Sequence, residues 1–133
     1  MKFIFLFVFL LTNNLFAASI TKTNGSVDEL KIITIKGEII SGDESKFRTL
    51  ALSTKNAIVV LDSPGGKINP ALEIGKMIRL NGYATEVKNA QCTSSCALIW
   101  LAGEPRSMNN NTSIGFHSAF LKGDDGTRNL QQL

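Results

Sequence analysis

A continuous apolar run, AIVVL at 57–61, is the feature that most limits what this 133-residue chain can fold into. The run is rich in β-branched residues, which is typical of a parallel strand buried on both faces. KIITI (31–35) predicts a second strand, and the alternation in YATEV (83–87) predicts a half-exposed third strand. Parallel strands need long crossovers between them, usually helices, so the sequence predicts an α/β domain with a mainly parallel sheet.

Helix signals lie between these strands. Ser41-x-x-Glu44 matches a capping box and predicts that a helix begins there. A second helix is delimited by Asn69 as N-cap, by Pro70 at the first helical position and by Gly82 after the last turn. The chain therefore alternates strands with helices, and right-handed crossovers are expected between the strands.

The chain after residue 96 shows signals for one more helix and one more strand. ALIWLA (97–102) predicts a short buried helix, and EPRSMNNNTS (104–113) is read as loop with at most a brief strand. SIGFH (113–117) predicts a last strand. Ligands of parallel sheets bind at the carboxyl ends of the strands. Those ends are expected at LDSPGG (61–66), at the turn carrying CTSSC (92–96) and near the histidine of SIGFH.

The N-terminus has the outline of a secretory signal peptide, assigned to residues 1–18. Lys2 is followed by an unbroken apolar run at 3–11, about half the length of a membrane-spanning helix. Cleavage is expected near residues 17–19, at Leu-x-Ala or Ala-x-Ser. Export to the periplasm or secretion follows, and an uncleaved membrane anchor is the alternative. Residues 19–30 are interpreted as a linker.

Length and charge limit the class of protein. The chain corresponds to one domain, assigned to residues 31–121. The net charge of +3 comes from scattered residues without a basic run, which argues against a nucleic-acid partner. The tail, residues 122–133, is polar and shows no closing strand or helix, so we expect it to be the start of a further C-terminal portion.

Chemically active residue types gather at the expected strand ends. The CTSSC turn offers the hydroxyls of Thr93, Ser94 and Ser95 before a helix start, where free N–H groups stabilise negative charge. Capping of the helix is the simpler interpretation of these hydroxyls. His117 is the one histidine of the chain, and histidine is the most frequent general base. Gly66 follows a strand and offers a backbone amide to an oxyanion.

The order of these motifs resembles that of the Clp protease proteolytic subunit and its relatives of the Clp/crotonase fold. The similarity covers about residues 31–120 and is carried by LDSPGG (61–66) and IGFH (114–117). Signal peptide peptidases of the same fold share the first motif but use a Ser-Lys pair. The CTSSC turn is similar to the Cys-x-Ser-x-Cys turn of exported, periplasmic Clp-class serine proteases. The resemblance implies a repeated β-β-α/βα spiral.

The resemblance also implies roles for single residues. Ser94 matches the nucleophile and His117 the base of a serine endopeptidase. The amides of Gly66 and Ser95 match the oxyanion donors, and Gly65 and Gly66 match substrate-binding residues. Peptides or unfolded segments are the implied substrates, without a cofactor. No ATPase partner is expected outside the cytoplasm, and family members form rings, so a homo-oligomer is one expectation.

The acidic member of the family's triad has no counterpart in the chain. It lies well downstream of the histidine, where only Asp124 and Asp125 supply carboxylates, and nothing in the sequence orders them. Loss of this acid lowers turnover by about 10⁴-fold in a serine triad. A weak Ser94–His117 dyad, a catalytically silent binding protein and a Ser-Lys peptidase using Lys122 therefore all stay open.

Cys92 and Cys96 are four residues apart. An exported protein favours a disulfide, whereas regular helical geometry directs the two side chains poorly for one, so packed free thiols are the alternative. A metal site is not expected, because a structural zinc ion needs four ligands and the chain has a single histidine.

Overall fold

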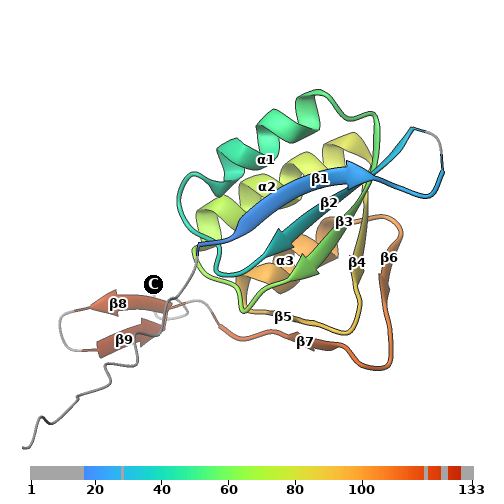
Figure 1. Ribbon diagram of the computed structural model, residues 1–133. Coiled ribbons are helices and arrows are strands. Elements are labelled where there is room, and N and C mark those ends of the chain that lie inside the picture. Colours follow the sequence, from blue (N-terminus) through green and yellow to red (C-terminus); the bar gives the residue numbers. More distant parts are fainter. Residues whose placement is uncertain (1–16, 28, 119, 124–125, 130–133) are drawn as a thin grey trace, which may run out of the picture.

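The computed structural model describes residues 17–27, 29–118, 120–123 and 126–129. The predicted signal peptide lies almost entirely outside these residues. The described strands of the main sheet are β1 (Ser19–Asn24), β2 (Leu30–Lys36), β3 (Asn56–Asp62), β4 (Ala84–Val87) and β6 (Arg106–Met108). They lie in the order β1-β2-β3-β4-β6 (Figure 1), with β1 antiparallel to β2 and the other neighbours parallel. The predicted α/β class with a mainly parallel sheet is confirmed.

Three helices are found among the described residues: α1 (Asp43–Leu52), α2 (Ile68–Asn81) and α3 (Ser95–Ala102). α2 contacts both α1 and α3, so the helices form one layer (Figure 1). This layer covers the face of the sheet where side chains such as Ile33, Val59 and Leu61 are completely buried. The neighbouring residues of β3 on the other face are only half-buried, so the prediction that this strand is buried on both faces is too strong.

The helix starts differ from their predicted capping patterns. α1 begins at Asp43 after Gly42, which has a left-handed backbone and no side-chain cap, so the capping box at Ser41 is wrong. α2 begins at Ile68, two residues before Pro70, because the extended residue Lys67 precedes it. The predicted stop is confirmed: Gly82 is left-handed with φ of 67°.

Both ends of the domain contain more regular structure than the sequence indicated. The expected linker includes β1, which pairs with β2 along its whole length. It was missed because an edge strand with one core-facing side needs few apolar residues, and SITKTN has only Ile20. The antiparallel pair of β8 (Phe120–Gly123) and β9 (Gly126–Asn129) extends into the polar tail. The expectation that no strand lies there is therefore wrong.

A second, small sheet pairs β5 (Gln91–Thr93) with β7 (Ser113–Gly115) in parallel (Figure 1). β7 is shorter than the predicted strand 113–117, and Phe116 and His117 follow its end. Ile114 packs against the core, whereas Phe116 is exposed, so the expected alternation stops at Gly115. None of the helices within the described residues combines the length and apolar character that crossing a membrane requires.

Candidate functional site

Three chain segments that carry the predicted site residues meet at one end of the small sheet. Beyond the end of β3, Ser63 bridges in parallel to Cys92 of β5. The Ser63 N–H donates to Gln91 O at 2.8 Å, and the Thr93 N–H donates to Ser63 O at 3.1 Å. β7 pairs with the other side of β5, with Thr93 opposite Gly115. The carboxyl ends of all three segments therefore lie together.

Ser94 occupies the turn between β5 and α3 in a strained backbone conformation. Its φ of 57° and ψ of −129° are unusual for a residue with a side chain, and such positions cost about 1–3 kcal/mol. Its N–H donates to Gly115 O at 2.9 Å, which extends the strand pairing by one step. Its hydroxyl makes no capping hydrogen bond, so the simpler interpretation of this serine as a side-chain cap is wrong.

Gly65 lies directly against this turn. A Cβ added to it would meet Thr93 O at 2.6 Å, Ser94 Cβ at 2.7 Å and Ser95 N at 3.0 Å. The Thr93 hydroxyl donates to Pro64 O at 3.0 Å and joins the same two segments from the side. The residue at this position must therefore be glycine, both for the close approach and for its φ of 94°.

The amide of Gly66 is left without a partner by the way its chain is paired. Gly66 bridges to Ile39, where the Ile39 N–H donates to Gly65 O at 2.8 Å and the Lys67 N–H donates to Ile39 O at 2.9 Å. In a parallel bridge of this kind the central residue, Gly66, turns its own N–H away from Ile39. In the described part of the chain this N–H donates to no acceptor.

The amide of Ser95 is the second open donor. Ser95 is the first residue of α3, so its N–H has no acceptor inside the helix, and no described residue outside the helix accepts from it. The Ser95 side chain is buried, and its hydroxyl has no hydrogen-bond partner among the described residues. The backbone of Ser95 thus faces the turn while its side chain lies inside the domain.

His117 follows β7 by two residues and is exposed. Its Nδ1 lies 2.7 Å from the carbonyl oxygen of Ser118. Because a carbonyl oxygen can only accept, Nδ1 carries a hydrogen in this contact. In a serine triad the histidine likewise carries a hydrogen on Nδ1 and takes the serine proton on Nε2.

The two cysteines of the CTSSC turn form a disulfide that closes a ring around Ser94. The S–S distance is 2.00 Å, and Cys92 and Cys96 are both completely buried. Cys92 lies in β5 rather than in a helix, which removes the geometric objection to a bridge between the two. No group of potential metal ligands is found among the described residues.

Ser63 also shapes the site, although it was not predicted from the sequence as a site residue. The Ser63 hydroxyl donates to Gly37 O at 2.6 Å and accepts from the Gly65 N–H at 3.0 Å. A serine two residues before a glycine in a turn is a known signal for this bond. Asp124 and Asp125 lie outside the described residues, and Lys122 belongs to β8.

No family model matches the chain, and no curated protein matches its sequence. One similar structure is a mutant of the membrane-bound stomatin-specific protease 1510-N, with a TM-score of 0.59 and 21% identity. Another is a mutant of ClpP1 from Listeria monocytogenes, with a TM-score of 0.60 and 22% identity.

These matches cover 72% and 71% of this chain, but only 52% and 58% of the two solved chains. This chain therefore spans about half the length of the proteins it is compared with. At this level of identity the likeness concerns the fold, and it agrees with the β-β-α/βα arrangement expected from LDSPGG and IGFH. The chain has the fold of the Clp-type proteases.

Proposed function

We propose that this protein is an exported serine peptidase that hydrolyses peptide bonds with Ser94 as nucleophile and His117 as base. The Ser94 oxygen attacks the peptide carbonyl carbon while His117 takes the hydroxyl proton. The resulting oxyanion accepts hydrogen bonds from the amides of Gly66 and Ser95. His117 then donates its proton to the leaving amine, and water hydrolyses the acyl-enzyme by the same steps in reverse order.

One observation carries this proposal: the strained Ser94 turn lies against Gly65, and the residues that follow these two in the chain, Ser95 and Gly66, each have an open amide. A serine hydroxyl that capped α3 would not need a positive φ. Strained residues cluster where a reacting group must be held in place. Donors that are already oriented toward a developing oxyanion each contribute about 3–4 kcal/mol to transition-state stabilisation.

Pairing of β5 with β7 supports His117 as the base. Ser94 and His117 follow the paired residues Thr93 and Gly115 by one and two positions, at the same end of the sheet. The Nδ1 contact with Ser118 O involves the ring nitrogen that a triad acid binds.

Location and substrates belong to the same proposal. The predicted signal peptide and the Cys92–Cys96 disulfide both favour an oxidising compartment, such as the periplasm. We expect short peptides or unfolded segments to be cleaved without ATP or an unfoldase.

Labelling with a fluorophosphonate probe tests the proposal directly. The full-length protein should be labelled at Ser94, and Ser94→Ala and His117→Ala should each abolish the labelling. Ser113→Ala, which changes an exposed serine of β7, is the matched control and should be labelled like the wild type. Absence of labelling in the folded wild-type protein would instead favour a catalytically silent Clp-fold binding protein.

A further inference from the structure

The loop between β2 and α1 holds the Gly66 amide in place. Ile39, in this loop, makes both hydrogen bonds that flank Gly66, one to Gly65 O and one from the Lys67 N–H. The contact is close, since a Cβ on Gly66 would lie 2.2 Å from Ile39 O. A shift of this loop therefore moves the Gly66 amide with it.

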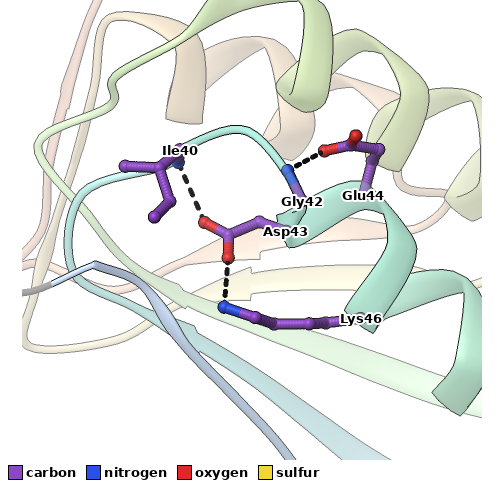
Figure 2. A network of polar contacts seen from close by, with 5 residues as sticks. All are labelled: Ile40, Gly42, Asp43, Glu44 and Lys46. Atoms are coloured by element: carbon purple, nitrogen blue, oxygen red, sulfur yellow. Dashed lines mark hydrogen bonds and ion pairs between the residues drawn. The ribbon is translucent and has the colours of Figure 1, made fainter.

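A buried carboxylate fixes the same loop from behind. The Asp43 side chain is completely buried, and its Oδ2 accepts from the Ile40 N–H at 2.9 Å. Its Oδ1 lies 2.9 Å from Lys46 Nζ, one turn further along α1 (Figure 2). The Asp43 N–H returns to Ile40 O at 3.3 Å. A buried carboxylate is tolerated when it is paired and hydrogen-bonded, and Asp43 meets both conditions.

A neighbouring carboxylate has a different position. Glu44 Oε2 accepts from the Gly42 N–H at 2.9 Å, at the end of the loop that joins α1 (Figure 2). Glu44 is only half-buried. Both carboxylates thus accept hydrogen bonds from this loop, but only Asp43 binds Ile40, the residue next to Ile39.

We propose that Asp43 is a positioning residue for the oxyanion-binding amide of Gly66, acting through Ile40 and Ile39. This inference rests on the proposed peptidase function and adds a residue that touches neither substrate nor nucleophile. Lys46 supports Asp43 by completing its ion pair. Loss of the negative charge removes the anionic partner of the Lys46 ammonium and weakens the hydrogen bond from the Ile40 N–H, because bonds to an ionised acceptor are the stronger ones, so the loop is held less firmly.

The kinetic test compares Asp43→Asn with Glu44→Gln, each a neutral replacement of similar shape. Inactivation by a fluorophosphonate separates probe binding from the chemical step. For Asp43→Asn we expect the maximal inactivation rate to fall about 10- to 100-fold, because misplacement of a catalytic group costs up to about 100-fold. The probe concentration for half-maximal rate should change little. Glu44→Gln should keep the wild-type rate within about twofold, since its bond lies outside the path to Gly66.

Amide hydrogen exchange provides a readout that does not depend on activity. In Asp43→Asn the amides of Ile39 and Lys67 should exchange faster than in the wild type, and in Glu44→Gln they should not. Wild-type exchange of both amides in Asp43→Asn, or equal effects of the two variants on the inactivation rate, would overturn the inference. An unlabelled wild-type protein with the expected exchange pattern would refute the peptidase proposal while leaving Asp43 as the anchor of Gly66.

A second variant tests the inference in case Asp43→Asn does not fold. Lys46→Met keeps the carboxylate and its bond to Ile40 but removes the ion pair at an exposed lysine. Faster exchange of Ile39 and Lys67 and a smaller fall in inactivation rate are expected. If neither the exchange nor the inactivation rate changes in Lys46→Met, the supporting role of Lys46 is contradicted. If Asp43→Asn is also unfolded, the same result overturns the inference itself.

Discussion

At the residue scale, two adjacent serines differ in backbone conformation and in the surroundings of their side chains. Ser94 has the positive φ of the turn, and its hydroxyl is not used in capping. Ser95 is the first residue of α3, with a buried side chain and an open N–H. The division between them therefore depends on where the helix begins, which is a property of the backbone and not of the residue type.

Replacement of Ser95 by alanine separates the roles of the two serines. Ser95→Ala keeps the backbone amide, so we expect fluorophosphonate labelling at close to the wild-type rate. Its stability should be unchanged or higher, because an unpartnered buried hydroxyl costs free energy. Labelling rate and melting temperature check both points. Loss of labelling in a folded Ser95→Ala protein would contradict the assignment of the nucleophile to Ser94.

Tyr83 predicts a pH dependence of stability. Its side chain is buried, and its hydroxyl donates to Thr54 O at 2.5 Å. Burial raises the pKa of the Tyr83 phenol above its ordinary value of 10.0. The unfolded chain then loses the proton first, so the stabilisation is complete below the unfolded pKa and is lost as the pH rises through the folded pKa.

Urea unfolding at alkaline pH measures this effect. The wild-type free energy of unfolding should fall above about pH 10, the range in which an unperturbed tyrosine ionises. Tyr83→Phe removes the titrating group, so its free energy should be lower at neutral pH but fall less steeply with alkali. Equal slopes for the two proteins would show that Tyr83 is not responsible.

At the element scale, the β5–α3 turn is held by several neighbours at once. β7 binds the Ser94 N–H, Gly65 packs against the turn, and the Cys92–Cys96 bridge closes the ring around it. A ring this small stabilises the whole domain less than a long disulfide loop would. Its main expected effect is therefore local, on the conformation of Ser94.

A variant without the disulfide tests this local role. In the double variant Cys92→Ala, Cys96→Ala we expect the labelling rate to fall about tenfold. Without the bridge, Ser94 can relax from its strained conformation, which costs about 1–3 kcal/mol, and its hydroxyl is then no longer held in place. The melting temperature should fall by only a few degrees. A variant that unfolds at much lower temperature yet labels normally while folded would contradict the role of the bridge in positioning Ser94.

At the scale of the whole molecule, one helix layer and one sheet face share a single core. Phe47 of α1 is completely buried in it, together with isoleucines of α2 and α3 and the inward residues of β2 and β3. Cys92 and Cys96 of the CTSSC turn belong to the same core, so its packing also supports the candidate site.

Phe47→Ala should reduce the free energy of unfolding by about 3–5 kcal/mol, the usual cost of deleting a buried aromatic side chain. Leu52→Ala, at an exposed position of the same helix, is the control and should change it by less than about 0.5 kcal/mol. Urea titrations of the three proteins measure both values. Similar losses in both variants would show that α1 is not packed through Phe47.

Several features were determined by the sequence alone, because they depend on local chemistry. The apolar run of β3 indicated a parallel sheet. Gly82 indicated the end of α2. The motifs LDSPGG and IGFH led to the Clp-type fold. Side-chain periodicity and turn residues act over a few positions, so they can be recognised without the rest of the molecule.

Other features were decided only by the tertiary structure. β1 is a strand because β2 offers it an edge, and the backbone around Gly66 is held by Ile39, 27 residues earlier in the chain. Neither partner is marked by local sequence. The positive φ of Ser94 likewise depends on Gly65, β7 and the disulfide acting together. Contacts between segments far apart in the chain carry no short-range signal, which is why the sequence suggested the candidate site residues but not the contacts that hold them.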